Sequence, residues 1–117
     1  MEWKKALAEL VELLAQRMKK VDCQFREMFG YPAYFINGNM FTGVHAEDIF
    51  LRLSTSDIQK IMKTHSQVTP FEPMPGRAMS GYVVIPKTVH MNDKAFAEWL
   101  GRSIEYVSSL PPKQKKR

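Results

Sequence analysis

The clearest alternation of apolar and polar positions lies in residues 29–53, FGYPAYFINGNMFTGVHAEDIFLRL. Runs of apolar and aromatic residues are divided there by Asn37-Gly38 and again at residues 46–48. Asn-Gly is a strong hairpin signal, because a two-residue type I′ turn requires positive φ at both central positions. The pattern therefore predicts three short strands in succession, and strands linked by tight turns are antiparallel.

The two faces of this predicted sheet differ in chemistry. Every second residue of 49–53 is Ile or Leu, so one face of the third strand is aliphatic. Phe35 and Phe41 lie near the Asn-Gly turn, and together they can make the second face aromatic. An aromatic face is not left wholly to water, so we expect helices or a second copy of the chain to cover it.

Three amphipathic helices are predicted around the sheet. In residues 3–20, apolar side chains recur every three or four positions and form one helical stripe. A second helix begins after Ser54, which opens a capping-box pattern. A third begins at Asn92 or Asp93, and residues 111–112, both proline, end it.

The remaining segments complete the order of elements. Residues 21–28 form a connector that can include an edge strand, and residues 82–85 form a strand ended by Pro86. Between them, residues 68–81 contain three prolines and two glycines, which exclude a regular central strand, but large apolar residues predict that this loop packs down. The order α-β(3-4)-α-β(1-2)-α predicts an α+β fold, a single antiparallel meander with helices packed on it.

Length and charge fit one domain followed by a tail. A chain of 117 residues, 44% hydrophobic, suits a single domain over residues 1–110. Four of the 17 basic residues lie in the last five positions, and without them 13 basic residues face 12 acidic ones. We therefore expect a nearly neutral folded body and a disordered basic tail at residues 111–117.

Several classes of protein are excluded. No apolar run approaches the roughly 20 residues of a membrane span, and the N-terminal residues lack the apolar core of a signal peptide. We expect a cytoplasmic protein with no membrane partner. Cys23 is the only cysteine and has no base among its neighbours, so we interpret it as a small, half-buried apolar residue.

The sequence shows no catalytic or metal-binding signature. Among the three histidines, only His45 has acidic residues close by, and Glu47 and Asp48 belong to a predicted turn. No nucleophile-elbow, zinc-helix or Walker-type motif occurs. We therefore expect no enzyme activity, no metal and no cofactor.

Two sets of residues are candidate contact sites. The loop around Arg77 could hold a small ligand or an anion, because a guanidinium offers a fork of donors, although an ion pair with Glu72 is the simpler interpretation. The basic residues of the first helix end and of the tail could bind a polyanion weakly, although a solvated surface is again simpler. The candidate ligand or partner loop comprises Phe71, Glu72, Met74, Gly76, Arg77 and Tyr82. The candidate polyanion contacts are Arg17, Lys19, Lys20, Lys113, Lys115, Lys116 and Arg117.

A series of motifs resembles, in order and spacing, the N-terminal domain of the TfoX/Sxy family. They are Met28-Phe29-Gly30, NGNMF at 37–41, IFLRL at 49–53, PFEPMPGR at 70–77, and the strand at 82–86 with the helix around Phe96 and Trp99. The resemblance covers nearly the whole chain. One departure is Tyr31-Pro32, where the family often has a second glycine after MFG.

This resemblance implies helices on an antiparallel sheet and no known catalytic activity. The competence regulators of the family promote transcription with other proteins and carry a second, helical domain, so we expect a stand-alone N-terminal domain here. We expect a non-catalytic protein-interaction domain that forms a homodimer and is accessory to transcriptional or competence regulation. The alternatives are weak nucleic-acid binding through the basic residues, and small-ligand binding at the loop 71–77.

Overall fold

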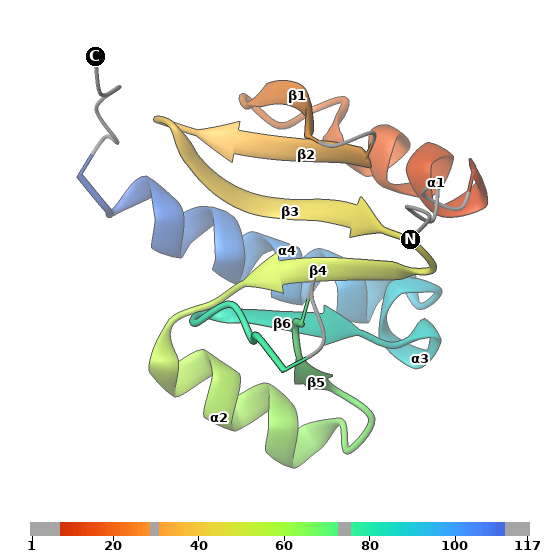
Figure 1. Cartoon of the computed structure of the whole chain (residues 1–117), viewed down its shortest axis with the longest axis vertical. Coiled ribbons are helices and arrows are strands. Elements are labelled where there is room, and N and C mark those ends of the chain that lie inside the picture. The colour runs from red at the N-terminus through yellow and green to blue at the C-terminus, as the bar shows by residue number, and fades with distance from the viewer. Residues whose placement is uncertain (1–7, 29–30, 73–75, 112–117) are drawn as a thin grey trace.

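The computed structural model describes residues 8–28, 31–72 and 76–111 (Figure 1). One six-stranded sheet has the order β1-β2-β3-β4-β6-β5, and every neighbouring pair is antiparallel. The α+β fold and the order of elements are as predicted. The strands are β1 Gln24–Met28, β2 Tyr31–Ile36, β3 Asn39–His45, β4 Asp48–Arg52, β5 Thr69–Pro70 and β6 Tyr82–Ile85. The helices are α1 Ala8–Met18, α2 Thr55–Thr64, α3 Lys87–His90 and α4 Asp93–Ser108.

The turns of the meander have the predicted chemistry. Asn37 and Gly38 have φ values of 53° and 80°, so both adopt the left-handed conformation that a type I′ turn requires. Ala46 has a φ of 54° and begins the turn from β3 to β4. The predicted edge strand is β1, which pairs with β2 at the end of the sheet.

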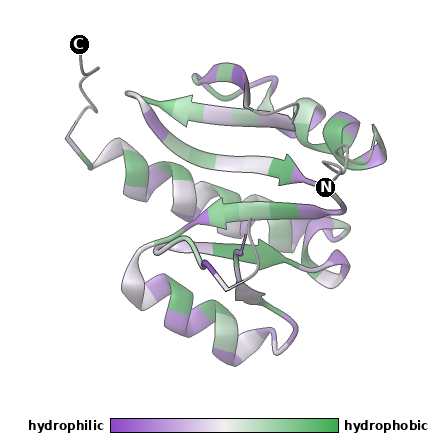
Figure 2. Ribbon diagram, viewed as in Figure 1, coloured by the Kyte–Doolittle hydropathy of each residue, from purple (hydrophilic) through white to green (hydrophobic). Residues whose placement is uncertain are grey.

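The helices pack on one face of the sheet. In Figure 1, α4 crosses behind β3 and β4, while α2 lies beside the end of the sheet formed by β6 and β5. Green and purple segments alternate along α2 and α4 in Figure 2, as expected for helices with one buried face. The core between helices and sheet contains buried Leu14, Ile49, Leu51, Ile61 and Phe96, among others.

A β-bulge in β3 changes the predicted composition of the two faces. Tyr34 pairs with Thr42, but Phe35 pairs with Met40, so Phe41 is an extra residue. The ring of Phe41 is completely buried in the core between the sheet and the helices. The hydroxyl of Ser103 on α4 donates a hydrogen bond to the backbone carbonyl of Phe41 at 3.4 Å. Phe41 therefore does not lie on the aromatic face, where it could have joined Phe35, because the bulge shifts the alternation by one residue.

Local capping explains where two helices begin. The hydroxyl of Ser54 accepts a hydrogen bond from the backbone N–H of Asp57 at 3.2 Å, as predicted. The side chain of Asn92 caps α4 by accepting from the N–H of Ala95 at 3.0 Å, which decides between the two predicted caps. The short helix α3, which follows Pro86, was not predicted.

Candidate functional site

The second face of the sheet carries a cluster of aromatic side chains. Phe50 on β4 is fully buried, and its ring stacks on that of Phe71 with the centroids 4.5 Å apart. Tyr31 and Tyr82 approach the Phe50 ring edge-on, at 6.4 Å and 6.0 Å. His45 joins the cluster through edge-on contacts with Tyr31 and Phe71. Such edge-on and offset pairs are the favoured arrangements of aromatic rings.

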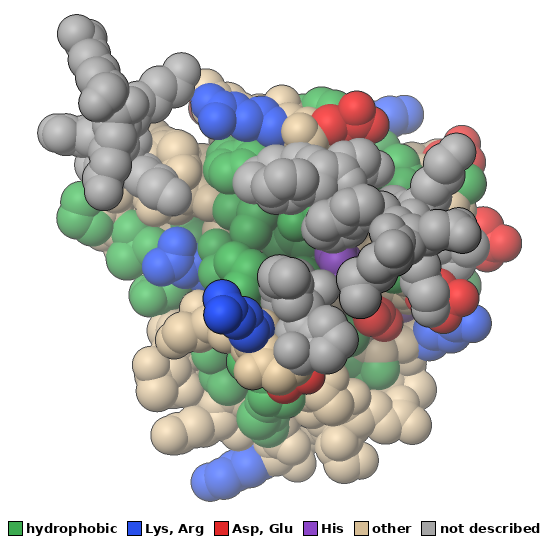
Figure 3. Space-filling model, viewed as in Figure 1, with side chains coloured by type: hydrophobic (Ala, Val, Ile, Leu, Met, Phe, Trp, Pro, Cys, Tyr) green, Lys and Arg blue, Asp and Glu red, His purple; other side chains and the backbone are tan. Residues whose placement is uncertain are grey.

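Part of this face is covered by the chain's own loop after β5. The N–H of Phe71 donates to the carbonyl of Tyr82 at 3.1 Å, and the N–H of Met79 donates to the carbonyl of Phe71 at 2.8 Å. These bonds hold the described ends of the loop against β6, so the prediction that it packs down is confirmed for Phe71 and Met79. The cover expected from helices or a second copy is thus supplied in part by this loop. Figure 3 views this side, where hydrophobic side chains form a patch, with some Lys and Arg side chains directly beside it and others at the margin.

The candidate ligand loop divides into packed and exposed residues. Phe71 is 2% exposed and Tyr82 is 8% exposed, and both belong to the aromatic cluster. Glu72, Gly76 and Arg77 are exposed. Met74 lies outside the described residues. The structure thus brings Phe71 and Tyr82 together in a packing role, and ligand binding by this loop stays a prediction.

Tyr82 also connects the aromatic cluster to charged groups. Its hydroxyl donates a hydrogen bond to the carbonyl of Met40 at 2.8 Å. The guanidinium of Arg52 lies over the Tyr82 ring at 5.6 Å and over Tyr106 on α4 at 5.7 Å. Burial raises the pKa of the Tyr82 phenol, an effect that nearby Arg52 opposes. The Tyr82 hydroxyl is therefore a hydrogen-bond donor at neutral pH.

The edge strand β1 is the second notable surface. Gln24, Phe25, Arg26 and Glu27 are all exposed, and the Phe25 ring is 56% exposed. It touches only the edge of the Tyr34 ring among the aromatic residues described, with the centroids 5.4 Å apart. Because β1 is the outermost strand, one of its two edges has no neighbouring strand within the described part of the chain.

The candidate polyanion contacts are only partly described. Arg17 forms an ion pair with Asp93, and its guanidinium lies 5.8 Å from the centroid of the Phe96 ring. Lys19 and Lys20 are exposed at the end of α1. The tail residues Lys113, Lys115, Lys116 and Arg117 lie outside the described residues. A role for these side chains in nucleic-acid binding stays a prediction.

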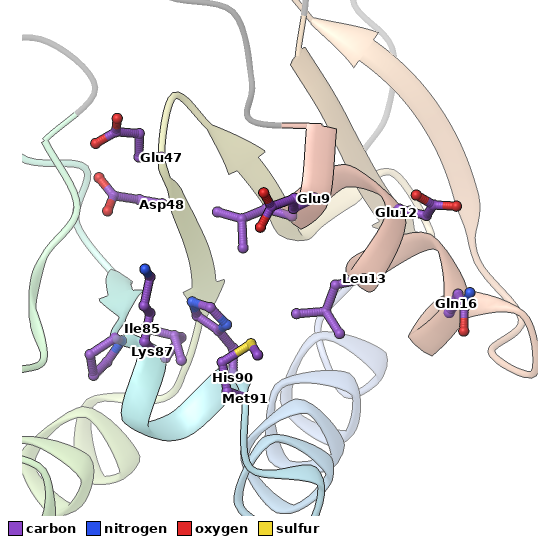
Figure 4. Close-up of a pocket in the computed structure, with 12 residues that line it drawn as sticks. Glu9, Glu12, Leu13, Gln16, Glu47, Asp48, Ile85, Lys87, His90 and Met91 are labelled. Atoms are coloured by element: carbon purple, nitrogen blue, oxygen red, sulfur yellow. The ribbon is translucent and has the colours of Figure 1, made fainter.

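A cleft between α1, the β3–β4 turn and α3 was not predicted from the sequence. It has a volume of about 780 Å³ and is shown in Figure 4. In the described part of the chain, its rim carries four carboxylates, and its floor includes Ile85 and the half-buried Leu13. The carboxylates are those of Glu9, Glu12, Glu47 and Asp48. Glu47 and Asp48 had been assigned only to a turn, and helical spacing gave no reason to place Glu9 and Glu12 opposite them.

His90 lines this cleft and is almost fully buried, at 2% exposure. Its Nδ1 atom has no hydrogen-bond partner within the described structure. Burial and, to a smaller degree, the ammonium of Lys87 lower the pKa of His90, while Asp48 opposes them. The imidazole is therefore neutral at pH 7.

Cys23 adds little chemistry to these surfaces. Burial, followed by the nearby carboxylate of Asp22, raises the pKa of the half-buried Cys23 thiol, which makes it a poor nucleophile. In the described residues, no three His, Cys, Asp or Glu side chains are grouped so that they could hold a metal ion. None of the helices in the described ranges is long and apolar enough to cross a membrane.

A comparison with protein-family models decides the family. The model of the TfoX N-terminal domain matches residues 12–107, which is most of the 117-residue chain. The chain belongs to the TfoX N-terminal domain family. Neither the curated proteins nor the solved structures gave a match.

The matched range of this TfoX N-terminal domain contains both surfaces and most of the cleft. It spans the aromatic cluster, the edge strand β1 and His90, and it begins at Glu12, so Glu9 alone of the rim carboxylates precedes it. Tyr31-Pro32 of this TfoX N-terminal domain lies at the start of β2. There Tyr31 contributes a ring to the aromatic cluster, which a glycine would not supply.

Proposed function

We propose that this TfoX N-terminal domain is a non-catalytic protein-interaction domain that self-associates through β1 and assists transcriptional regulation. The observation that carries the proposal is the exposed ring of Phe25 in the outermost strand of the sheet. An open edge presents unpaired N–H and C=O groups, which are a template for a strand of another molecule. The aromatic ring adds apolar area at the same place.

The residues of β1 favour one register of self-pairing. When two copies pair through β1 about a two-fold axis perpendicular to the sheet, the central residue lies opposite itself. The residue after it then lies opposite the residue before it in the second copy. Centred on Phe25, the pairing stacks the two phenyl rings and sets Gln24 opposite Arg26 of the second copy. Centred on Arg26 or on Glu27, it would oppose two like charges, which destabilises a sheet.

The dimer is expected to be weak. The strand is only five residues long, and interfaces below about 1,200 Å² in total are characteristic of transient complexes. Self-association should therefore depend on concentration in the micromolar to millimolar range. It should tolerate salt, because the central contact is apolar.

The test compares two exposed hydrophobic residues. Light scattering and sedimentation equilibrium are measured for the wild type and for Phe25→Ser over a wide concentration range. Met91→Ser is the matched control, since Met91 is also highly exposed but lies far from β1 in the α3–α4 connection. We expect the wild type and Met91→Ser to dimerise and Phe25→Ser to remain monomeric. A monomeric wild type at the highest concentration, or an unchanged Phe25→Ser, contradicts the proposal.

The regulatory part of the proposal rests on the family. The competence regulators of the TfoX/Sxy family promote transcription together with other proteins, and the resemblance to that family implies a related role here. The gene for this protein is deleted, and the strain is complemented with the wild type or with Phe25→Ser. Transcript levels in these strains test the regulatory role separately from self-association. Transcript levels that do not respond to the deletion would contradict a regulatory role, whatever the oligomeric state.

A further inference from the structure

The cleft beside α1 has a charge opposite to that of the whole chain. Among the described residues, four carboxylates and one ammonium, that of Lys87, line it, whereas the chain as a whole has a net charge of +5. Figure 4 shows that the carboxylates come from two sides, with Glu9 and Glu12 on α1 and Glu47 and Asp48 at the turn. Their combined field attracts a cationic group into the space between them.

The floor of the same cleft is apolar. Leu13 from α1 and Ile85 from β6 form part of it, and Met91 lies at its margin with 68% of its surface exposed. An exposed methionine is a flexible and adaptable contact for an apolar partner. A ligand that complements this cleft therefore combines positive charge with aliphatic surface, as the side chains of lysine and arginine do.

A second and independent feature is the ring of His90. It is turned into the space between α1 and the β3–β4 turn (Figure 4), and its buried Nδ1 atom has no hydrogen-bond partner among the residues that the structure describes. A buried polar atom without a partner is unfavourable, and such atoms in folded proteins call for an explanation. A ligand that hydrogen-bonds to this nitrogen would remove the penalty.

The spread of the carboxylates distinguishes between possible cations. Within the described ranges they do not converge into a group of three that could hold a metal ion. A metal needs its oxygen ligands within about 2–2.6 Å of one point. An extended cationic chain, in contrast, can meet carboxylates that lie on both sides of a cleft.

We propose that this cleft binds a basic segment of a partner protein, in which a lysine or arginine side chain lies on the apolar floor and reaches the rim carboxylates and His90. The inference names the chemistry of a partner for the interaction domain proposed above and rests on that function. It uses a surface separate from β1, because no β1 residue lines the cleft.

The first experiment uses two peptides that differ in charge. Acetyl-Lys-Leu-Lys-Leu-Lys-amide and acetyl-Glu-Leu-Glu-Leu-Glu-amide are titrated into the isotope-labelled full chain, and the amide and imidazole NMR signals are recorded. The lysine peptide should produce saturable shifts at Leu13, Asp48 and His90. The glutamate peptide should produce none, and the affinity for the lysine peptide should fall as salt is added.

The second experiment removes the rim charges one at a time. Glu12→Gln and Asp48→Asn should each weaken binding by about threefold, as expected for exposed charge pairs. Glu105→Gln, on the exposed side of α4 and outside the cleft, is the matched control and should leave the affinity unchanged. All three residues are exposed, so the folded state should survive each change.

The outcomes separate this inference from the proposed dimer. Equal binding of both peptides, shifts confined to other surfaces, or equal losses from Glu105→Gln and Asp48→Asn would overturn the cleft assignment. If the chain dimerises through Phe25 but binds no lysine peptide, only the cleft assignment fails. If Phe25→Ser and the wild type are both monomeric and the lysine peptide still binds, only the dimer fails.

Discussion

The ring of Phe50 occupies the space in which a side chain at Gly43 would lie. The two residues are directly paired between β3 and β4. A Cβ atom at position 43 would lie 2.6 Å from Cζ of Phe50 and 2.6 Å from the carbonyl oxygen of Pro32. The close packing of Phe50 over bare backbone is what allows it to stack on Phe71 at the centre of the aromatic face.

We predict that Gly43→Ala destabilises the domain by about 2–3 kcal/mol, because both the ring and the β2 backbone must move. Urea unfolding followed by fluorescence measures the change. Gly101→Ala is the control, since a Cβ atom there meets nothing within 4 Å on the exposed side of α4. It should stabilise the domain by about 0.5–1 kcal/mol through helix propensity. Equal effects of the two substitutions would contradict the packing argument.

Loss of the Phe71 ring should show that the loop after β5 is a structural element. The ring is 2% exposed and stacks on Phe50, so we predict that Phe71→Ala lowers the free energy of unfolding by about 3 kcal/mol. Phe25→Ala, at an exposed ring, should change it by less than about 1 kcal/mol. Urea unfolding gives both values, and near-UV circular dichroism should lose aromatic signal mainly in the first variant. A small effect of Phe71→Ala would mean that the loop does not contribute to the core.

An ion pair links α2 to α4. Arg102 donates to Asp57 at 2.9 Å and to Glu98 at 3.3 Å, and its guanidinium lies 4.9 Å from the Trp99 ring. The Asp57 side chain is more buried than that of Glu98, at 18% against 57% exposure. A double-mutant cycle with Arg102→Ala should therefore give about 0.5–1 kcal/mol of coupling with Asp57→Asn and less with Glu98→Gln. A larger coupling with Glu98 would reverse this ranking.

The sequence predicted correctly the features that depend on neighbouring residues, and it missed features that depend on residues far apart in the chain. The turn at Asn37-Gly38 and the cap at Ser54 depend on neighbouring residues, and both were correctly predicted. The burial of Phe41 among the helices depends on the bulge that shifts the register of β3, and the alternation pattern gives no sign of an extra residue. The alternation of residues along β3 therefore predicts which face of the sheet a side chain lies on only as far as the bulge.

The packed loop at Phe71 and the acidic cleft show the same contrast between features that the local sequence predicts and features that depend on distant residues. The loop at Phe71 was correctly predicted to pack down, because large apolar residues in a proline-rich segment need cover. The acidic cleft was missed, because it joins Glu9 on α1 to Asp48 and His90, far apart in the sequence. A buried histidine also looks like any other loop histidine until its neighbours are known.

The buried imidazole of His90 should make stability depend on pH. Burial and Lys87 lower its pKa below the value of 6.5 expected in the unfolded chain. Between those two values the unfolded state binds a proton that the folded state does not. The free energy of unfolding should therefore be unaffected by His90 above pH 6.5 and should fall as the pH drops from there to the folded-state pKa.

The difference between variants isolates this contribution from the other titrating groups. Urea unfolding across this pH range should show a smaller loss of stability for His90→Asn than for the wild type, whatever its stability at neutral pH. His65→Asn is the comparison variant, and the loss of stability caused by His90 should persist in it, because His90 is still present. Asp48→Asn removes a charge that raises the His90 pKa, so its loss of stability should extend to lower pH than in the wild type. A wild-type slope in His90→Asn would mean that the imidazole takes up its proton in the folded protein as easily as in the unfolded chain.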